Sequence, residues 1–291
     1  MAQKLVGIIG GSGLGDALKQ QLTDAQSQEV ETPFGKTSGA VYLGKLGKKN
    51  VAFLNRHGPG HRLSPSEVPY AANIFAMKEL GVRAIISSGA VGSLREEIAP
   101  GHLVIVDQFI DKTFRRTSSF FNDFAAVHCE MAEPLCGRLR KILIDTAATI
   151  DIQTHPKGTY VCMEGPQFST RAESLMHRAW GGDLIGMTAM PEVKLAREAQ
   201  ICYVLIALPS DYDCWRPHND SADKQTLLQE IISNLQNACD NCIKLIKAVL
   251  ESDSQLVHND CPCRKSLDLA VWTEVSKIEP SKKQQLQVLF E

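Results

Sequence analysis

A strand, a tight turn and the start of a helix follow one another in the stretch Gly158-Thr-Tyr-Val-Cys-Met-Glu-Gly-Pro-Gln-Phe-Ser-Thr-Arg-Ala-Glu173. The run Tyr-Val-Cys-Met is strand-forming, and the Gly-Pro pair after it breaks the run. Ser169 stands where a helix N-cap belongs, with Glu173 in the first turn. The turn therefore brings the ring of Phe168 and the hydroxyl of Ser169 to the end of a strand, where open α/β sheets bind ligands. Taken alone, the stretch is more simply explained as an ordinary βα turn with Phe168 in the core.

Two further stretches of this kind each end an apolar strand, namely Gly186-Met-Thr-Ala-Met-Pro-Glu192 and Ser210-Asp-Tyr-Asp-Cys-Trp215. Together with the first stretch and the glycine turn Gly7-Ile-Ile-Gly-Gly-Ser-Gly-Leu14, they resemble the purine nucleoside phosphorylase superfamily. Within it they are most similar to the 5′-methylthioadenosine phosphorylases of the trimeric branch. The resemblance runs with few gaps from the glycine turn to about Trp215 and the helix after it, and several long motifs in the right order make it specific.

The order of strands and helices predicts an α/β fold, and a length of 291 residues suits one large domain or two small ones. The resemblance implies a single-domain twisted mixed β-sheet flanked by helices. It assigns residues 1–250 to a nucleoside phosphorylase domain and leaves 251–291 as a C-terminal extension that contains Cys261-Pro-Cys263. Apolar residues recur at steps of four and three from Leu227 to Val249, which predicts one buried face of a long helix.

The composition excludes several classes of partner. Hydrophobic residues make up 44% and charged residues 22% of the chain, as in soluble globular proteins. A net charge of −2 gives no basic field, so we expect no nucleic acid partner. We expect no membrane partner, because no apolar run approaches the ~20 residues of a membrane helix. Nine cysteines, mostly inside apolar runs, and the absence of a secretory signal pattern predict a cytoplasmic protein with reduced thiols.

Glycines and an arginine follow several predicted strands. The turn Gly10-Gly-Ser-Gly13 lets backbone N–H groups approach an anion, and the helix start behind it adds a favourable dipole. The spacing G-x-G-x-x-G cannot be laid on residues 7–15, which argues against a dinucleotide-binding fold. Arg56 offers a planar fork that suits phosphate oxygens, although an isolated Arg-His pair is as often part of a solvated loop. At Gly89, where relatives often carry a hydroxyl residue, a backbone contact alone is available. The residues that the resemblance assigns to phosphate are Ser12, Arg56, His57, Gly89, Ala90 and Thr188.

Phosphorolysis of a purine nucleoside, the reaction that the resemblance implies, sets the other roles. Cleavage of the glycosidic bond passes through an oxocarbenium-like sugar, and the base leaves with negative charge. Asp211 is the candidate general acid at N7 of the base, as a carboxyl group that burial keeps protonated. Asp213 would accept from the 6-amino group, Phe168 would stack on the purine and Met187 would lie against the ribose. Without this context, an Asp-x-Asp pair after a strand is an ordinary polar turn. The residues assigned to the nucleoside are Phe168, Ser169, Met187, Asp211, Tyr212 and Asp213.

The choice of base follows from Ser169 and Asp211. The 6-oxopurine phosphorylases of the family carry Glu after the stacking Phe and Asn at the Asp211 position, whereas acceptors that face position 6 favour an amino group and hence adenine. At the 5′ end, Lys224 departs from the apolar pattern of methylthioadenosine phosphorylases, so adenosine stays open as a substrate. The residues assigned to the 5′ pocket are Ser169, Ala222, Lys224, Leu228 and, across a subunit interface, His128 of the partner subunit.

Residues 107–134 are predicted to be irregular, and loops of this length are uncommon unless they are functional. In the trimeric members of the superfamily the matching loop reaches into the neighbouring subunit's site. The resemblance therefore implies that Phe120, Phe121 and His128 help to close the 5′ end of the pocket. The alternative is that the phenylalanines anchor the loop to their own core.

The leading hypothesis is a pentosyltransferase that converts 5′-methylthioadenosine and phosphate to adenine and 5-methylthioribose 1-phosphate, in methionine and purine salvage. We expect no metal and no organic cofactor, a nucleoside and inorganic phosphate as partners, and a homotrimer or a dimer of trimers. The alternatives are a phosphorylase of 6-oxopurine nucleosides or methylthioinosine, a broader adenosine phosphorylase, a nucleosidase that uses water, and a non-catalytic nucleoside-binding protein.

Four cysteines of the last part of the chain superficially offer zinc ligands, namely the pairs Cys239-x-x-Cys242 and Cys261-x-Cys263. The first pair falls inside the predicted long helix, where small apolar residues are expected. Structural cysteines are therefore favoured, and a redox pair or a disulfide stays open for Cys261 and Cys263.

Overall fold

The computed structural model describes residues 5–11, 13–216 and 224–290. Within these residues, eleven strands form one mixed sheet and two strands form a separate small hairpin. The sheet contains β1 (Leu5–Gly10), β2 (Thr23–Gln28), β5 (Val41–Leu46), β6 (Lys49–Asn55), β7 (Val82–Ser93), β8 (Leu103–Ile105), β9 (Gln108–Lys112), β10 (Thr154–His155), β11 (Thr159–Met163), β12 (Leu184–Gly186) and β13 (Cys202–Asp211). The hairpin consists of β3 (Glu31–Thr32) and β4 (Gly35–Lys36). The helices are α1 (Gly15–Lys19), α2 (Tyr70–Glu79), α3 (Gly137–Thr149), α4 (Arg171–Ala179), α5 (Glu192–Glu198), α6 (Lys224–Glu251) and α7 (Pro280–Gln285).

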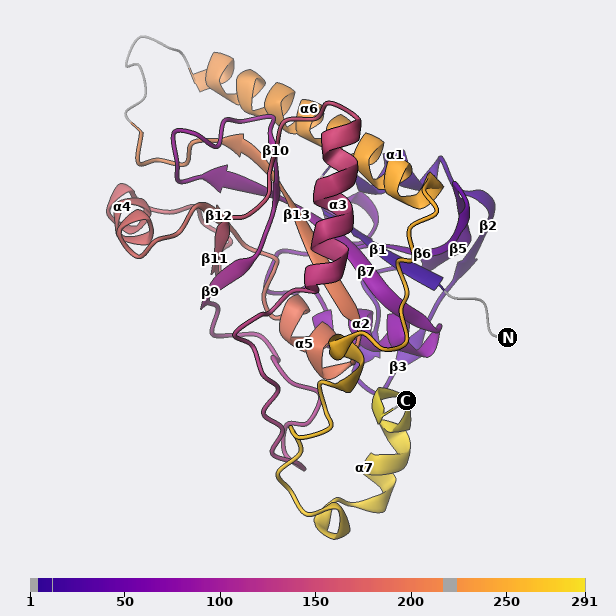
Figure 1. Ribbon diagram of the computed structural model, residues 1–291. Helices are drawn as coiled ribbons and strands as arrows, with labels where there is room; N and C mark the ends of the chain where they lie inside the picture. The colour runs from indigo at the N-terminus through magenta and orange to yellow at the C-terminus, as the bar shows by residue number, and fades with distance from the viewer. Residues whose placement is uncertain (1–4, 12, 217–223, 291) are drawn as a thin grey trace.

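The main path of the sheet runs β10-β8-β13-β7-β1-β6-β5-β2 (Figure 1). Its centre is parallel, because β1 pairs in parallel with both β6 and β7, and β13 pairs in parallel with β7. The far end of the long strand β7 also pairs antiparallel with β12, which carries β11 and β9 beside it. The predicted single-domain mixed sheet flanked by helices is confirmed, and β5 and β6 form an antiparallel hairpin within it.

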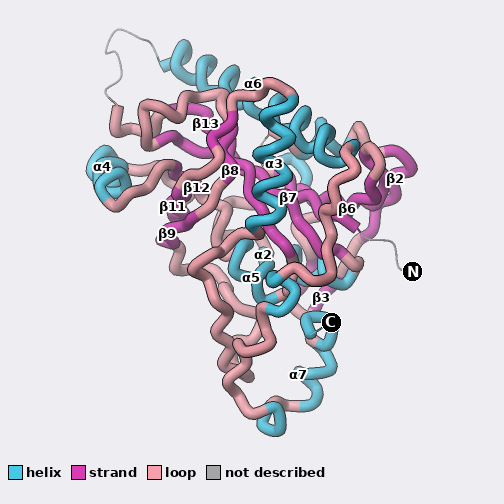
Figure 2. The backbone as a smooth tube through the Cα atoms, in the orientation of Figure 1, coloured by secondary structure: helices cyan, strands magenta, loops and turns pink. Residues whose placement is uncertain are grey.

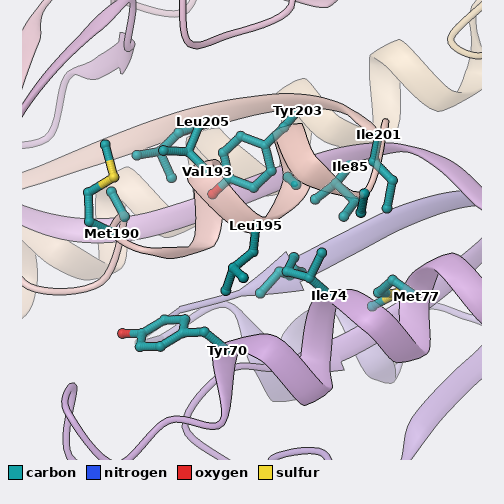
Figure 3. Packing of buried hydrophobic residues seen from close by; sticks show 14 of the residues in the cluster. Tyr70, Ile74, Met77, Ile85, Met190, Val193, Leu195, Ile201, Tyr203 and Leu205 are labelled. Carbon is teal, nitrogen blue, oxygen red and sulfur yellow. The ribbon is translucent and has the colours of Figure 1, made fainter. Parts of the chain in front are cut away.

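Two helical layers cover the sheet because side chains alternate between the faces of its strands. In β6, Val51 and Phe53 belong to one buried cluster, whereas Ala52 and Leu54 belong to the other. The first cluster contains the apolar side chains of α3 and α6, and the second contains those of α2 and α5. Figure 3 shows the second layer, in which Ile74 of α2 lies on the side of that helix that faces Leu195 of α5.

The cap of α4 differs by one residue from the prediction. Thr170, rather than Ser169, is the N-cap: its hydroxyl accepts from the backbone N–H of Glu173 (3.2 Å), and the Glu173 carboxylate accepts from the N–H of Thr170 (2.8 Å). This reciprocal pattern requires the spacing Thr-x-x-Glu, which Ser169 does not have. The hydroxyl of Ser169 is therefore directed elsewhere, toward the sulfur of Met163 at 3.6 Å.

The tail after α6 returns to the same core. Leu256 and Val257 are buried in the cluster under α3 and α6, and Leu286 and Leu289 are buried in the cluster under α2 and α5. Part of the tail runs beside the segment that follows β9, with which it shares an isolated bridge between Val127 and Val271 (Figure 2). In the part of the chain that the structure describes, no helix has the length and apolar character needed to cross a membrane.

Candidate active site

The carboxyl ends of the parallel strands bring the predicted site residues to one edge of the sheet. The end of β1, at Gly10, is level with Asn55 of β6, so Arg56 follows directly beside the glycine turn. In the parallel pair of β7 and β13, Gly89 and Ala90 of β7 lie level with residues 207 and 208 of β13. Asp211 ends β13. Ligands of open α/β sheets bind at this edge. Ser12, which was predicted to bind phosphate, lies outside the described residues.

Arg56 is completely buried and is held by a network of hydrogen bonds. Its Nε and Nη2 atoms donate to the two carboxylate oxygens of Glu192 at 2.7 and 2.8 Å. Nη2 also donates to the hydroxyl of Ser87 (2.5 Å), and Nη1 donates to the carbonyl oxygen of Ser88 (2.8 Å). A guanidinium has five N–H groups, so the four bonds to described residues leave one N–H on Nη1, the atom that lies next to Gly11. The arrangement leaves one directed donor at the turn.

The opposite charges of Arg56 and Glu192 each favour the ionised form of the other residue. Burial opposes the charged form of Arg56, but the adjacent Glu192 carboxylate raises the pKa of the guanidinium above its ordinary value. Burial likewise opposes the ionised form of Glu192, and the Arg56 charge lowers the pKa of this carboxyl. The hydroxyl of Tyr203 donates a further hydrogen bond to Glu192 at 2.6 Å. The pair is therefore ionised and nearly neutral as a unit, so Arg56 offers a positioned N–H more than a free positive charge.

Thr188 joins this edge from the loop after β12. A Cβ atom built on Gly89 would lie 3.3 Å from the Thr188 hydroxyl oxygen, so the hydroxyl sits directly over the glycine backbone. On the other side, a Cβ atom on Gly11 would lie 2.8 Å from the carbonyl oxygen of Ser88 and 2.9 Å from Nη1 of Arg56. The structure thus brings the glycine turn, Arg56, Gly89 and Thr188 together, and this set of N–H and hydroxyl donors can hold an anion.

His57 lies beside Arg56, and its ring is already engaged. Its Nδ1 atom is 2.8 Å from the carbonyl oxygen of Leu63, and its ring stacks on that of His61 with centroids 4.1 Å apart. Burial lowers the pKa of His57 to about 4, and the positive charge of Arg56 adds to the effect. The ring is therefore neutral near pH 7, and its Nδ1–H donates to Leu63, which leaves Nε2 as an acceptor. A donor to phosphate at this position has to come from the backbone rather than from the imidazole.

Asp211 and Asp213 lie at the end of β13 against Gly92. The carboxylate of Asp211 accepts from the hydroxyl of Ser210 (2.8 Å) and from the backbone N–H of Asp213 (2.7 Å). Asp213 accepts from the hydroxyl of Ser174 on α4. Burial raises the pKa of Asp213, the nearby Asp211 carboxyl adds to the shift, and the Ser174 hydroxyl opposes it. The hydrogen bonds fix both carboxyl groups at the edge that carries Arg56 and Thr188.

The other predicted nucleoside residues are less enclosed. Phe168 is 86% exposed in the single chain, so its ring lies outside the core. Met187 packs against Gly165, where a Cβ atom would lie 2.6 Å from its sulfur. The hydroxyl of Tyr212 approaches the carbonyl oxygen of Glu96 at 3.4 Å. The structure therefore places Met187 near Thr188, but leaves Phe168 free of a partner ring among the described residues.

Residues 5–251 match the family model of the phosphorylase superfamily. The chain belongs to this superfamily. The resemblance read from the strand-end motifs is thereby confirmed, and the matched region extends from β1 to the end of α6.

Curated relatives in the superfamily cover nearly the whole chain. The chain is 45% identical to the S-methyl-5'-thioadenosine phosphorylase of Cereibacter sphaeroides, over 95% of this chain and 93% of that protein. It is 43% identical to the enzyme of the same name from Thermosynechococcus vestitus, over 98% of this chain and 97% of that protein. Both alignments include most of the tail as well as the sheet.

Solved structures of methylthioadenosine phosphorylases are also similar to this chain. A methylthioadenosine phosphorylase from an antarctic soil metagenomic library is 44% identical, with a TM-score of 0.87 over 100% of both chains. The methylthioadenosine phosphorylase of Schistosoma mansoni in complex with adenine is 36% identical, with a TM-score of 0.78 over 85% of this chain and 91% of that one. The shared fold therefore includes members of the phosphorylase superfamily that bind a purine base.

One charged pair that supports the superfamily site was missed by sequence reasoning. Arg116 and Glu164 form an almost fully buried ion pair, with Nε of Arg116 3.1 Å from the carboxylate. Nη1 of Arg116 also donates to the carbonyl oxygens of Met187 and Met190, both at 2.6 Å. Burial opposes the ionised form of Glu164, but hydrogen bonds led by the Ser66 hydroxyl lower its pKa to about 2. The pair ties the strand-end loops to each other, and the sequence shows nothing more of it than charged residues in a loop and a turn.

The predicted loop of residues 107–134 includes a strand, β9, which pairs in parallel with β11. Phe120 and Phe121 are buried in their own core, so the alternative that they anchor the loop is the one that the structure bears out. His128 is exposed, and its ring lies nearly perpendicular to that of Trp272, which is itself 74% exposed. The loop therefore presents an aromatic surface next to the tail.

The predicted 5′ pocket is described in part. Ala222 lies outside the described residues, and so does the side chain of Lys224, although Lys224 begins α6. Leu228, on the first turns of that helix, is 56% exposed. Within this chain the start of α6 therefore presents an apolar side chain that its own core does not cover.

Proposed function

We propose that this member of the phosphorylase superfamily cleaves 5′-methylthioadenosine with phosphate and releases adenine and 5-methylthioribose 1-phosphate. It is a pentosyltransferase of the purine nucleoside phosphorylase type. One observation carries the proposal. The anchored guanidinium of Arg56, the backbone of Gly89 and the hydroxyl of Thr188 lie together at the carboxyl ends of neighbouring strands, where Asp211 ends β13. An anion site and a carboxyl group on neighbouring strand ends are what phosphorolysis of a nucleoside requires.

The phosphate side of the reaction depends on positioning. In our proposal the residues that hold phosphate are Ser12, Arg56, His57, Gly89, Ala90 and Thr188. The phosphate oxygen attacks C1′ on the face opposite the base, and the C1′–N9 electron pair moves to the purine. Because the Arg56 charge is balanced by Glu192, the bound phosphate keeps much of its own negative charge, which stabilises the cationic sugar.

The base side of the reaction depends on Asp211. We assign to it the proton or hydrogen bond at N7 that neutralises the leaving base, and to Asp213 an acceptor role toward the 6-amino group. Phe168 and Tyr212 enclose the purine, Ser169 lies beside the base and the 5′ end, and Met187 lies against the ribose. General acid assistance of this kind contributes roughly 10²–10⁴-fold to the rate.

The choice of substrate rests on the named relatives and on the start of α6. Curated relatives that are 42% to 45% identical to the chain are S-methyl-5'-thioadenosine phosphorylases. A solved relative from Schistosoma mansoni is an adenosine/methylthioadenosine phosphorylase, and α6 here begins with Lys224. Adenosine is therefore the second candidate substrate. The 5′ pocket in this proposal is made by Ser169, Ala222, Lys224, Leu228 and His128 of the partner subunit.

The assembly in our proposal is a homotrimer, or a dimer of trimers, located in the cytoplasm. The exposed aromatic surface of His128 and Trp272 supports an interface at the loop, because large exposed rings are typical of contact surfaces. Phosphorolysis needs no redox or electron-sink chemistry, so no organic cofactor enters the proposed reaction, and its small-molecule partners are the nucleoside and phosphate.

The test is release of adenine from 5′-methylthioadenosine with and without phosphate, with adenosine and methylthioinosine measured in parallel. We expect strict phosphate dependence and the fastest turnover with methylthioadenosine. Equal rates with adenosine would keep the chemistry and assign the second candidate substrate. Faster turnover of methylthioinosine would overturn the roles of Ser169 and Asp211. Adenine release without phosphate would indicate a nucleosidase. Binding of the nucleoside without turnover would indicate a non-catalytic binding protein.

A further inference from the structure

Four cysteines from three distant parts of the chain meet in the core, away from the proposed reaction. Cys136 precedes α3, Cys202 begins β13, and Cys261 and Cys263 belong to the tail. Their sulfur atoms all lie within 4.8 Å of one another, and those of Cys136 and Cys261 are 3.7 Å apart. All four residues are buried, with exposed fractions between 1% and 7%. A closed cluster of four thiols is therefore a feature of the fold.

The spacing of the sulfur atoms matches a metal site better than a pair of disulfides. A disulfide joins two sulfur atoms at about 2.05 Å, whereas the Cys136 and Cys261 sulfur atoms are 3.7 Å apart. Zinc bound by thiolates has Zn–S bonds of about 2.3 Å in a tetrahedron, which places neighbouring sulfur atoms roughly 3.8 Å apart. Four sulfur atoms that are mutually within 4.8 Å can adopt this arrangement through small side-chain rotations.

We propose that Cys136, Cys202, Cys261 and Cys263 bind one zinc ion as a four-thiolate structural site. Each thiol loses its proton to solvent as its sulfur binds the metal, and no oxidant is needed. Four protein ligands leave no open position for a substrate or water, which is typical of structural rather than catalytic zinc. Thiolate ligands in a tetrahedral set select zinc over the hard cations magnesium and calcium.

The position of the site separates it from phosphorolysis. Cys202 begins β13 and Asp211 ends it. Nine residue steps along a strand span roughly 30 Å, at about 3.3 Å for each residue. The cluster therefore lies near the opposite edge of the sheet from the proposed reaction, and metal binding is expected to affect stability rather than turnover.

The site would fasten the tail to the core. Two of its ligands come from the tail, one precedes α3 and one begins β13. Nearby, Arg138 of α3 donates to the carbonyl oxygens of Gln255 and Leu256, and these hydrogen bonds hold the tail against α3. Pro262 between the two tail ligands stands at the start of a 3₁₀ turn, Pro262–Lys265, and restricts the backbone there. A preformed loop of this kind lowers the conformational cost of binding.

The quartet that the structure assembles is not the one that the sequence suggested. Cys239 of α6 lies under the glycine turn, where a Cβ atom on Gly13 would be 2.7 Å from its sulfur. Cys242, one turn further along, is fully buried among apolar side chains. Neither belongs to the group of four sulfur atoms found among the described residues. Cys242 therefore supplies a matched control, as a buried cysteine of the same core with no part in the proposed site.

The first measurement is the metal content of the full-length protein, produced without a metal-binding tag and purified under reducing conditions. We expect one zinc per chain by elemental mass spectrometry. After removal of zinc with a thiol-blocking mercurial and then excess dithiothreitol, titration with Co²⁺ should give the intense visible bands and the near-ultraviolet charge-transfer bands of tetrahedral cobalt thiolate. The metal-free protein should also melt at a lower temperature than the zinc-loaded protein.

The second measurement compares variants. Cys263→Ser and Cys136→Ser should each lower the zinc content below one-half per chain and weaken the cobalt charge-transfer bands, whereas Cys242→Ala should retain both. Zinc that is absent from the wild-type protein and not taken up on titration would overturn the proposal, whether the cysteines are then found as free thiols or, by peptide mass spectrometry, as disulfides. Equal zinc binding by the wild type and Cys263→Ser would overturn it as well. Because the wild-type titration requires no substitution, a variant that fails to fold leaves the test intact.

Discussion

Arg56 and Glu192 are 136 residues apart in the chain and form a bidentate ion pair that is completely shielded from solvent. The pair joins the end of β6 to the start of α5, which follows the loop that carries Thr188. Its two parallel hydrogen bonds fix the plane of the guanidinium, and so they fix the position of Nη1 beside Gly11 in the glycine turn. The ion pair thus connects the stability of the fold with the geometry of the proposed phosphate site.

Glu192→Gln tests the stability side of this connection. The substitution leaves the Arg56 charge buried without its counter-charge, and loss of one partner of a buried pair typically costs about 3–5 kcal/mol. We expect a decrease of this size in the free energy of unfolding, measured by urea denaturation. Asp145→Asn is the control, because it breaks the exposed pair with Lys141 and should cost no more than about 1 kcal/mol. Similar losses in the two variants would contradict the role given to the buried pair.

Asp211→Asn tests the proposed role of this carboxyl at the base. The amide retains the size of the side chain but cannot deliver a proton to N7, so we expect kcat with 5′-methylthioadenosine to fall roughly 10²–10⁴-fold. An amide both donates and accepts, so the ratio of methylthioinosine to methylthioadenosine turnover should rise. Both rates are measured at saturating phosphate, with the melting temperature as a check on folding. Unchanged turnover of the adenine nucleoside would remove Asp211 from the mechanism.

The buried carboxyl group of Glu198 should make the protein less stable as the pH rises. Its carboxylate, at the end of α5, accepts from the backbone N–H of Phe120 at 2.8 Å. Burial raises the pKa of Glu198 from 4.5 to about 7, although the Phe120 hydrogen bond opposes the shift. Between these two values the folded protein retains a proton that the unfolded chain has released. The Glu198 contribution to the free energy of unfolding is therefore fully present below pH 4.5 and is lost as the pH rises through about 7.

Comparison of Glu198→Gln with the wild type isolates this contribution, because other titrating groups are common to both proteins. We expect the stability of the glutamine variant, relative to wild type, to rise between pH 4.5 and 7 and then to level off. Urea denaturation at pH 5, 6, 7 and 8 measures the difference. Glu133→Gln, a change at an exposed acid, is measured in parallel as a control for the removal of one carboxyl group. A flat difference for Glu198→Gln would refute the inverted titration of this buried carboxyl.

Much of the fold could be predicted because local patterns decide it. The apolar strands, the glycine turn and the periodic helix that became α6 are properties of contiguous residues, and the carboxyl ends of parallel strands converge wherever such strands pair. This is why Arg56, Gly89 and Asp211 could be expected at one edge. The N-cap of α4 was misplaced by one residue because Ser169 and Thr170 are both good caps, and the spacing to Glu173 decides between them.

Long-range pairings could not be predicted from the same patterns. Nothing local distinguishes Glu192 at a helix start from any other acidic residue in a first turn, so its contact with Arg56 is a property of the assembled sheet. The cysteine cluster illustrates the same limit: Cys261 and Cys263 were noticed in the sequence, but their partners Cys136 and Cys202 come from elements more than fifty residues away. Residue type indicates what chemistry is available, and topology decides which groups meet.

Gly92→Ala tests how closely the backbone packs against the two aspartates. A Cβ atom at this position would lie 3.2 Å from the Oδ1 atom of Asp211, 3.1 Å from Cβ of Asp213 and 3.0 Å from a methyl carbon of Ile185. Contacts this short require the Ile185 methyl group and the side chains of the two aspartates to shift by a few tenths of an ångström. A displacement of about 1 Å at a reacting group costs on the order of 10²-fold in rate, so this smaller shift should cost less. We expect kcat/KM for 5′-methylthioadenosine to fall at least about 10-fold, with roughly 1–3 kcal/mol of destabilisation from overpacking.

Gly137→Ala is the matched control for this substitution. It is the first residue of α3, and a Cβ atom there would meet no described atom within 4 Å. Alanine favours a helix over glycine, so the control should retain full activity and equal or greater stability. Full activity in Gly92→Ala, with a melting temperature lowered as overpacking predicts, would mean that the aspartates can shift without loss of function. That outcome would remove the requirement for a fixed carboxyl position at the end of β13, whereas a selective loss of activity would support the proposal that Gly92 positions the two aspartates assigned to the base.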